Sequence, residues 1–361
     1  MVTERVPVLD VPARVPPRSR VRRLLTGPVG GTVLTVGVVV AVFAGLLPRL
    51  ADYADAWGLV RALTRTETVL VLVVALVNLF TYGPVWMAAL PGLTLGRAVM
   101  ADQASTAVSN TVPAGFALGV GVNAAMFSSF GLSPTAIARA VALTGVWNNL
   151  VKLGTPALAL AGVAVVADVP RGLELAAGLG SVLLLLAAGC LVAVVTHGTA
   201  AALLAATGER AVGALARVAG RSAPTGWVAR AERFRLDSLE LLRHRWVRLT
   251  VATVVSHAAL FLLLLTCLRT VAGAGVPWLT VLAVFSITRL VTAIPVTPGA
   301  LGVAELSYVA GLTAVGADPA AAAGAVLVFR LLTWLLPIPC GIVTWVAWRH
   351  GVGRAGAAPR P

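Results

Sequence analysis

Uninterrupted apolar stretches as long as a bilayer is thick constrain this chain more than any other feature of its sequence. Residues 68–90 and 172–196 are two such stretches. A bilayer core about 30 Å thick needs roughly 20 apolar residues in a helix, and neither stretch alternates as a spanning strand would. Only 12% of the residues are charged, whereas soluble domains carry roughly a quarter. The chain is therefore predicted to be an all-α polytopic membrane protein.

The hydrophobic pattern divides the chain into a tail, a membrane domain and a second tail. Residues 1–28 are rich in Pro and Arg and are predicted to be disordered, residues 29–350 form the membrane domain, and 351–361 form the second tail. The run 29–47 is too long for an ordinary signal-peptide core, so it is interpreted as a retained anchor, with a cleaved signal as the alternative. Six full spans are expected, at 29–50, 68–90, 134–167, 171–196, 246–270 and 318–349.

Two further apolar segments are interrupted in the middle by residues that break helices. Segment 97–130 contains NTVPAG at 110–115, and segment 278–316 contains PVTPG at 295–299. Proline removes a helix donor and glycine frees the backbone. Such breaks persist at membrane depth only where protein or a water-filled cavity shelters the backbone. Both segments are therefore predicted to be re-entrant hairpins of broken helices.

The distribution of basic residues orients the helices. Nine arginines between 210 and 248 place the link 197–245 in the cytoplasm under the positive-inside rule. Counting outward from this link puts both termini inside, segment 97–130 on the cytoplasmic side and segment 278–316 on the external side. About twenty of the 28 Lys and Arg residues are then cytoplasmic and about five external. The expected location is the cytoplasmic membrane of a cell.

A shared spacing indicates that the two broken segments belong to an internal repeat. Pro113 is followed by Pro134, and Pro298 by Pro319, at the same separation of 21 residues. Each unit would be span, hairpin, span, and the two units would have opposite orientations, as in many secondary transporters. The alternative is that Pro and Gly are simply frequent in membrane helices.

The second break carries a motif that resembles a known family. Residues 294–305 read IPVTPGALGVAE. This is similar to the best-preserved motif of the lysylphosphatidylglycerol synthase transmembrane family, the flippase-like domain of bacterial multiple peptide resistance factors. That motif has a proline, one or two spacers, Pro-Gly-Gly-Leu-Gly and then a glutamate, and here Ala300 replaces the second glycine. The first break resembles the family's weaker motif, although Val120 or Gly121 stands where an acidic residue is expected.

The resemblance covers about residues 30–350 and implies a role in moving or handling phospholipids across the cytoplasmic membrane. In fused members a soluble aminoacyl-transferase domain makes the lysyl lipid, and the residues after Arg349 are too few to form one. The chain is therefore expected to handle a lipid without synthesising it. Its expected partners are a membrane phospholipid and, in one alternative, a separate lipid synthase.

Ionisable side chains inside apolar helices are candidates for a site, because each costs at least roughly 2.5 kcal/mol at the bilayer centre unless it is paired or functional. Three cations against one carboxylate leave an excess positive charge that a lipid phosphate would neutralise. A helix that begins at Ala300 would add free backbone amides for the same anion. The predicted substrate-binding residues are Lys152, Arg289, Glu305 and Arg330, together with Pro113, Asn149, Pro298, Gly299 and Gly302.

Other interpretations of these residues stay open. Arg289, Glu305 and Arg330 could form a structural ion network between helices. Glu305 could instead be the general base of an intramembrane lipid-modifying transferase, or the chain could be a scaffold for a synthase that transports nothing. The sequence contains no paired-histidine zinc motif, Gly-x-Ser-x-Gly, P-loop or ATP-binding signature. The chain is therefore not expected to be an enzyme, and no metal, cofactor or nucleic-acid partner is expected.

Further polar and proline residues give weaker signals. Asp102 and Arg97 lie near the cytoplasmic end of the first hairpin, where they can pair with each other or with lipid. His257 is alone in its span and is interpreted as a packing residue. The expected kink sites are Pro156 in the span 134–167 and Pro337 or Pro339 in the span 318–349.

Overall fold

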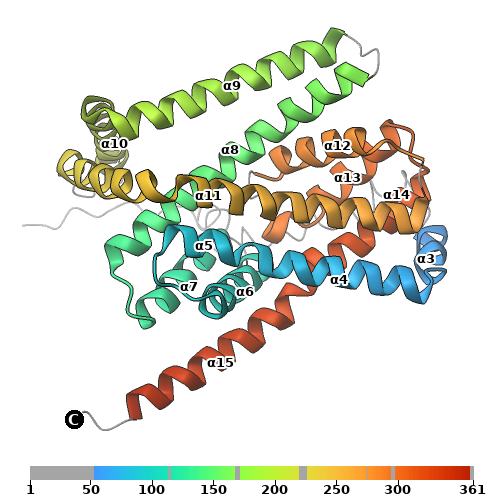
Figure 1. The fold of residues 1–361 in the computed structure, drawn as a ribbon, viewed down its shortest axis with the longest axis horizontal. Coiled ribbons are helices and arrows are strands. Elements are labelled where there is room, and N and C mark those ends of the chain that lie inside the picture. The colour runs from blue at the N-terminus through green and yellow to red at the C-terminus, as the bar shows by residue number, and fades with distance from the viewer. Residues whose placement is uncertain are drawn as a thin grey trace, which may run out of the picture.

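The computed structural model describes residues 53–112, 115–166, 171–218, 226–273, 275–293 and 297–357. Every element in these residues is helical, as the apolar pattern predicts (Figure 1). The predicted tail at 1–28 and anchor at 29–50 lie outside the described residues. The elements are α3 (Tyr53–Arg61), α4 (Arg65–Thr81), α5 (Gly83–Ala89), α6 (Leu95–Thr111), α7 (Gly115–Ser129), α8 (Pro134–Val166), α9 (Arg171–Thr196), α10 (Gly198–Val218), α11 (Trp227–Ala272), α12 (Trp278–Val291), the 3-10 turn η3 (Pro298–Ala300), α13 (Val303–Ala314), α14 (Pro319–Arg330), the π-helical turn η4 (Leu331–Leu335) and α15 (Pro337–Ala357).

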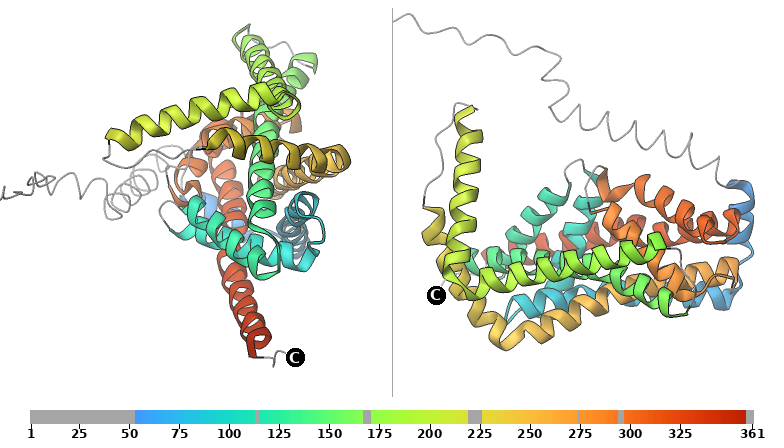
Figure 2. Two further views of the ribbon diagram at one scale, coloured as in Figure 1. Left: turned by 90° about the vertical axis from the view of Figure 1, so that its left-hand side faces the viewer. Right: turned by 90° about the horizontal axis from the view of Figure 1, so that it is seen from above.

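Three helical stretches are long and apolar enough to cross a membrane: Arg65–Ala89, Trp227–Val271 and Pro319–Gly351. A fourth would consist of Leu184–Val194 and Gly198–Ala214, but these two helices bend by 103° at the break between them. Figure 2 shows α10 lying across the direction of the longer helices. The fold is thus that of a helical membrane protein with three or four candidate spans among the described residues, and the count of six stays a prediction.

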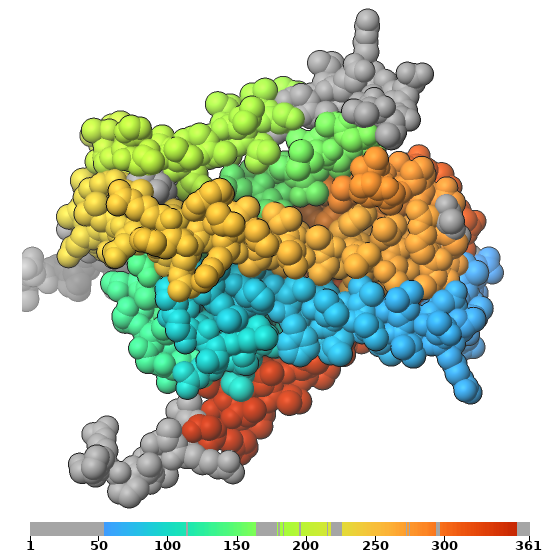
Figure 3. All heavy atoms as spheres, in the orientation of Figure 1, coloured from blue at the N-terminus to red at the C-terminus, as the bar shows by residue number. Residues whose placement is uncertain are grey.

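The outer face of α4 is apolar, as expected of a helix in contact with lipid. Seven large apolar side chains on this helix are 47 to 59% exposed. Together they form a long apolar surface of the kind that soluble monomers rarely expose. In Figure 3, α4 and α11 lie side by side and form one continuous face of the molecule. The exposed residues of α4 are Val69, Leu70, Leu72, Val73, Leu76, Val77 and Phe80.

Local sequence fixes the starts of two membrane helices. Thr64 and Glu67 form a capping box, in which the Glu67 carboxylate accepts from the Thr64 backbone N–H at 2.8 Å and the Thr64 hydroxyl accepts from the Glu67 backbone N–H at 3.3 Å. Asp318 caps α14 by accepting from the Ala321 N–H at 2.9 Å. Pro319 follows at the first helical position, where its missing N–H costs nothing.

Buried apolar side chains form two main clusters, one around each broken segment. The first cluster packs α5, α6, α7 and α8 against α11, around Phe127 and Leu249. The second packs α3, α4, α12, α13 and α14 against α11, around Phe285 and Tyr308. In Figure 1, α6 and α7 lie at one end of the molecule, and α12 and α13 lie toward the end that carries α3. The described residues are therefore organised as two halves that share α11.

The first broken segment folds as a helical hairpin. α6 and α7 have 17 and 15 residues, so they are about 26 and 23 Å long and fall short of a bilayer core of about 30 Å. A Cβ on Gly119 would collide with the side chain of Ser109 and the backbone of Ser105, so the helices touch closely there. Asn123 Nδ2 donates to the Ser105 hydroxyl across this contact at 3.1 Å.

The second broken segment has the same design with shorter arms. α12 and α13 have 14 and 12 residues, which gives about 21 and 18 Å of helix. A Cβ on Gly311 would collide with the side chain of Val284, which marks the close contact between the arms. The rings of Phe285 and Tyr308 stack beside it with centroids 6.4 Å apart.

The helix that leads to the C-terminus is interrupted near Pro337, where a kink is predicted. Five residues, Leu331–Leu335, form a π-helical turn between α14 and α15. The Leu336 N–H donates to the Leu331 carbonyl at 2.8 Å, which is the π-helical pattern. α8 continues as one helix through Pro156, the other predicted kink site.

Candidate functional site

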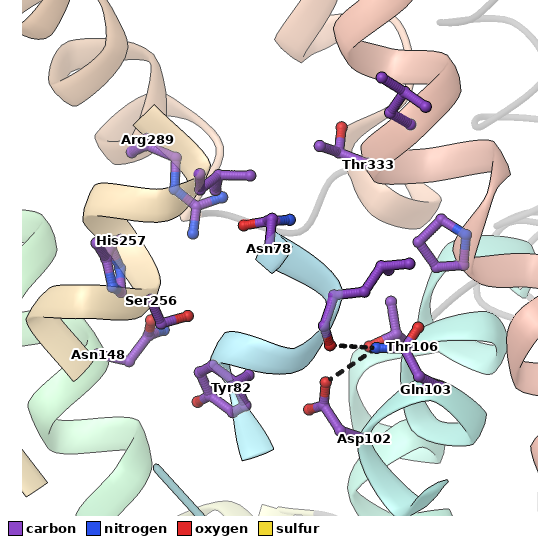
Figure 4. A pocket seen from close by; sticks show the side chains of 14 residues that line it. Asn78, Tyr82, Asp102, Gln103, Thr106, Asn148, Ser256, His257, Arg289 and Thr333 are labelled. Atoms are coloured by element: carbon purple, nitrogen blue, oxygen red, sulfur yellow. Dashed lines mark hydrogen bonds between the residues drawn. The ribbon is translucent and has the colours of Figure 1, made fainter. Parts of the chain in front are cut away.

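A polar cavity lies where the two halves of the described residues meet. Its volume is about 320 Å³, which corresponds to roughly ten water molecules at about 30 Å³ each. Residues of α4, α6, α8, α11, α12, η4 and α15 line it, so both halves contribute. Its polar lining residues, labelled in Figure 4, are Asn78, Tyr82, Asp102, Gln103, Thr106, Asn148, Ser256, His257, Arg289 and Thr333.

Arg289 brings an unpaired positive charge to this cavity. It lies in the last turn of α12, and Figure 4 shows its guanidinium pointing into the cavity. Its Nε is buried without a hydrogen-bond partner, and neither ion pair among the described residues includes it. Lys152 lies one turn beyond Asn148 on the same face of α8, within electrostatic reach of Arg289. Lys152 is not among the lining residues, so the positive charge in the lining on this side is that of Arg289.

The wall formed by α6 carries Asp102, the acidic residue of the cavity lining. Trp86 Nε1 donates to its Oδ1 at 3.2 Å, and Gln103 Nε2 lies 3.5 Å from its Oδ2. Gln103 Nε2 also donates to the Leu79 carbonyl at 3.2 Å, whereas Gln103 Oε1 is buried without a partner. Asp102 thus accepts few hydrogen bonds and forms no ion pair within the described part of the chain.

Close packing of α6 against α15 fixes the position of this wall. A Cβ on Gly341 would collide with the Gln103 carbonyl oxygen and with the side chain of Ala107, so glycine permits the approach of the two helices. Arg97 places its guanidinium carbon 5.2 Å from the centre of the Phe130 ring. The pairing of Arg97 with Asp102 that the sequence allows is therefore not formed.

The motif loop, residues 297–302, has a backbone that a regular helix cannot adopt. Gly299 and Gly302 have φ values of 57° and 85°. A Cβ on Gly299 would also lie against the ring of Trp334 and 2.8 Å from the side-chain oxygen of Asn110, so space as well as φ requires glycine. Because of these angles α13 begins at Val303, three residues later than the sequence indicates.

Glu305 and Arg330 hold the motif loop together. Glu305 Oε2 accepts from the Gly302 backbone N–H at 2.7 Å, and Oε1 accepts from Arg330 Nε at 2.7 Å. Arg330 Nη2 donates to the Gly299 carbonyl at 2.8 Å. Glu305 is only 6% exposed. These two predicted site residues therefore form a buried ion pair, and Arg289 is not part of it.

The comparison with known proteins covers most of the chain. A family model described as the lysylphosphatidylglycerol synthase TM region matches residues 32–341. The chain belongs to this family. No curated protein matches it. The matched range includes both broken segments and every residue that lines the polar cavity, so the cavity is part of the lysylphosphatidylglycerol synthase TM region.

In this TM region the tip of α6 meets the motif loop. Asn110 Nδ2 donates to the Trp334 carbonyl at 3.0 Å, and both residues flank Gly299. Pro113, the predicted site residue just beyond this tip, lies outside the described residues. The two interruptions seen in the sequence therefore lie side by side in the protein.

Two neighbouring asparagines of α8 face different surroundings. Asn149, a predicted site residue, is exposed and donates to the Gly145 carbonyl at 3.0 Å. It lines a separate, mostly apolar groove of about 980 Å³ between α8, α9, α10 and α11. Asn148 lines the polar cavity instead. Successive side chains of a helix point about 100° apart, and here this turn gives the two asparagines different surroundings.

Sequence reasoning missed the acidic wall of the cavity. It placed Asp102 near the cytoplasmic surface and treated His257 as packing, yet both line the cavity with Arg289. A signal was present, because Thr106 follows Gln103 by three residues and Asp102 by four, which are the spacings at which side chains of a helix lie near each other.

Ala300 is strained where the family motif has its second glycine. Its φ of 55° makes it the non-glycine residue with positive φ in the described part of the chain. The left-handed region costs an alanine roughly 1 to 2 kcal/mol, and part of this cost is offset by the lower entropy of its unfolded chain. We expect Ala300→Gly to stabilise the protein by about 1 kcal/mol, or roughly 2 °C in thermal unfolding. The matched control is Ala310→Gly inside α13, which should destabilise by a similar amount. An equal loss of stability in Ala300→Gly and Ala310→Gly would show that the backbone of Ala300 is not strained.

Proposed function

We propose that this chain binds the anionic head group of a membrane phospholipid in the polar cavity and moves that lipid across the cytoplasmic membrane. The observation that supports this most strongly is the guanidinium of Arg289, whose Nε is buried without a hydrogen-bond partner, in a polar cavity among apolar helices. An arginine at membrane depth costs roughly 2.5 to 3.5 kcal/mol on insertion scales. A ligand that neutralises it would offset this cost.

The charges near the cavity favour a ligand with a single negative charge. Glu305 and Arg330 neutralise each other. Arg289 and Lys152 together exceed Asp102 by one positive charge. A phosphodiester carries one negative charge, and the planar fork of arginine binds two phosphate oxygens at once. A phospholipid head group therefore matches both the charge and the geometry of this side of the cavity.

The Glu305–Arg330 pair has a positioning role in this proposal, as do the loop residues Pro298, Gly299 and Gly302. Leu332 and Thr333 line the cavity immediately after Arg330, so the motif loop and the cavity wall are held by the same residues. Both oxygens of Glu305 already accept hydrogen bonds from the protein. Glu305 is also buried and does not line the polar cavity, so a role as general base in a transferase has less support than translocation.

The membrane arrangement that we propose has six spans and two re-entrant hairpins in an inverted repeat, with the link 197–245 and both termini in the cytoplasm. The short arms of α6, α7, α12 and α13 support it, because none reaches the thickness of a bilayer core. The contact between the α6 tip and the motif loop supports it as well, because broken helices of inverted repeats meet near the midplane.

Cysteine labelling tests this arrangement. In a variant with its three native cysteines replaced, we expect Gly96→Cys and Ser133→Cys, which flank the first hairpin, to react only after the membrane is made permeable. Gly275→Cys and Val315→Cys, which flank the second hairpin, should react with an impermeant reagent in intact cells. All four positions are exposed. Labelling of Gly96→Cys and Ser133→Cys from opposite sides would make the first segment a crossing span and exclude the repeat.

A reconstituted assay tests the function itself. Purified full chain is placed in vesicles that contain fluorescent phosphatidylglycerol in both leaflets, and a membrane-impermeant quencher reports how fast inner-leaflet lipid reaches the outside. We expect relocation with the lipid recovered chemically unchanged by mass spectrometry. Recovery of a modified lipid would favour the transferase, and neither relocation nor modification would favour a scaffold for a separate lipid synthase.

A further inference from the structure

The apolar groove between α8, α9, α10 and α11 is separate from the polar cavity. Its volume is about 980 Å³, and none of its described lining residues also lines the polar cavity. Leu204 and Phe234 line the groove although they are 60% and 39% exposed, so the groove is open at the surface of the molecule. A Cβ on Gly145, another lining residue, would meet nothing within 4 Å. The described residues therefore leave this space unfilled.

α10 closes one side of the groove by following the first turns of α11 (Figure 1). A Cβ on Gly198 would lie 3.3 Å from the Glu232 carboxylate, and a Cβ on Gly208 would lie 3.2 Å from the Trp227 ring. Glu209 Oε2 also accepts from the Trp227 backbone N–H at 3.2 Å. The groove is therefore bounded by helices that contact one another, and it is not a gap beside a detached helix.

The wall formed by α11 gives the groove a charged part. Among the described lining residues the charged ones are Arg230 and Arg235, and most of the others are apolar. Arg235 also pairs with Glu232 at 2.6 Å, and Glu232 does not line the groove. Ser238, on the same wall, is 1% exposed, and its hydroxyl has no hydrogen-bond partner within the described residues. This wall therefore presents positive charge and a hydrogen-bond donor beside an apolar channel.

The length of the groove matches one leaflet of a bilayer. Arg139 Nη1 donates to the Asp237 carbonyl at 3.2 Å, so α8 begins beside the arginine-bearing part of α11. From there the lining residues of α8 run from Val141 to Leu153, which is about 18 Å of helix. Half of a bilayer core is about 15 Å thick. An acyl chain that starts near the arginines can therefore extend along the groove to the depth of the midplane.

Charge decides which kind of molecule fits the groove. Between residues 210 and 248 the sequence has nine arginines and three acidic residues. Basic segments of this kind at a membrane surface attract anionic lipids. An anionic phospholipid has both the charge that the arginines attract and the chains that the apolar walls accept. A zwitterionic phospholipid lacks the net charge, and a soluble anion lacks the chains.

We propose that the groove holds an anionic phospholipid of the cytoplasmic leaflet, with its phosphate at Arg230 and Arg235 and an acyl chain between α8 and α9. This lipid is not the transported one, because it fills a space between four helices away from the polar cavity. It stays bound and holds α9 and α10 against α8 and α11. The proposal goes beyond the proposed function and takes from it only the cytoplasmic position of the link 197–245.

The test measures how brominated lipids quench the fluorescence of Trp227, a lining residue of the groove. Purified full chain in detergent is titrated with phosphatidylglycerol or phosphatidylcholine whose chains are brominated near their carboxyl ends. The Trp227 signal is the difference between the unmodified protein and Trp227→Phe. We expect saturable quenching, with half-saturation at about tenfold lower concentration for the anionic phosphatidylglycerol, as one charge-assisted hydrogen bond would give.

Variants of α11 test the charged wall. Arg230→Gln combined with Arg235→Gln should reduce the preference for the anionic lipid to about threefold or less. The matched control is Arg233→Gln. Arg233 is exposed, is not among the lining residues, and donates from Nε to the carbonyl four residues before it, as Arg230 does. Arg233→Gln should keep the tenfold preference.

Two glycine variants test the position of the chain. Gly145→Phe places a ring in the groove and should abolish the saturable quenching of Trp227 by both lipids. Gly189→Phe is the matched control, because Gly189 is an exposed glycine of α9 that does not line the groove and whose added Cβ would also meet nothing within 4 Å. It should bind both lipids as the unmodified chain does.

Four results would overturn the proposal. Equal half-saturation by the two lipids in the unmodified protein would exclude an anionic site, and this comparison needs no variant to fold. Saturable quenching that survives in Gly145→Phe would place the lipid outside the groove. An equal loss of preference in Arg233→Gln would assign the effect to the charge of the whole segment. A dimer whose Trp227 neither lipid quenches would assign the groove to a second copy of the chain.

The outcome is independent of transport. Arg289→Gln should bind lipid in the groove as the unmodified chain does, since Arg289 lines only the polar cavity. Saturable quenching of Trp227 without any relocation of lipid in vesicles would overturn the proposed function and support the groove site.

Discussion

Arg330→Met is expected to destabilise the protein by about 3 to 5 kcal/mol, because it leaves the Glu305 carboxylate charged, buried and without its cation. The loss includes the bond of 2.8 Å from Arg330 to the Gly299 carbonyl, which holds a loop in which the positive φ of Ala300 is costly. Thermal unfolding of the purified protein in detergent and the yield from membranes are the measurements. Both should fall well below those of the unmodified chain.

Two further variants make this expectation specific. Adding Glu305→Gln to Arg330→Met removes the stranded charge, and the amide oxygen can still accept from the Gly302 N–H, so stability should recover in part. Arg349→Met removes an exposed arginine that lies over Trp345, and it should change stability by no more than about 0.5 kcal/mol. An Arg330→Met protein that melts like Arg349→Met would show that the pair does not stabilise the loop.

The helices and their breaks could be predicted from the sequence because both depend on local properties. α8 and α9 agree within one residue with the predicted 134–167 and 171–196. The breaks follow from proline and glycine, which act on their own turn of helix. The start of α11 was harder to predict. Hydropathy detects only the apolar part of this helix, from about residue 246, whereas the helix begins at Trp227 in a charged stretch.

The partners of the buried charges could not be predicted, because they depend on tertiary packing. Arg289 and Arg330 look alike in the sequence, as both are single arginines in apolar helices. Only the fold brings Arg330 to Glu305, through the late start of α13, and turns Arg289 into the polar cavity. The place of Asp102 in the cavity could not be predicted for a related reason. The close approach of α6 to α15 at Gly341 brings the α6 wall, which carries Asp102, into the interior.

Arg289→Gln is expected to remove activity without removing stability, which is the opposite of the result for Arg330→Met. Arg289 has no ion-pair partner among the described residues, so its loss strands no charge and relieves a cost of roughly 2.5 kcal/mol or more. The unfolding temperature should therefore stay the same or rise. A charge-assisted bond to phosphate is worth up to about 3 kcal/mol, so the rate of lipid relocation should fall about 100-fold.

The matched control for this variant is Arg269→Gln. Arg269 is also a part-buried arginine of the second half, but it donates to the Val276 carbonyl at 2.6 Å and does not line the cavity. Its substitution should cost some stability and should leave the rate of relocation in the folded protein near that of the unmodified chain. This contrast separates the loss of a charge in general from the loss of the charge at the cavity.

The most direct measurement of the central claim is the rate at which fluorescent phosphatidylglycerol relocates in vesicles that contain equal amounts of folded unmodified, Arg289→Gln and Arg269→Gln protein. We expect rapid relocation with the unmodified chain and with Arg269→Gln, and a rate near that of protein-free vesicles with Arg289→Gln. Relocation by Arg289→Gln at the rate of the unmodified chain would contradict the claim that a lipid phosphate passes through the polar cavity.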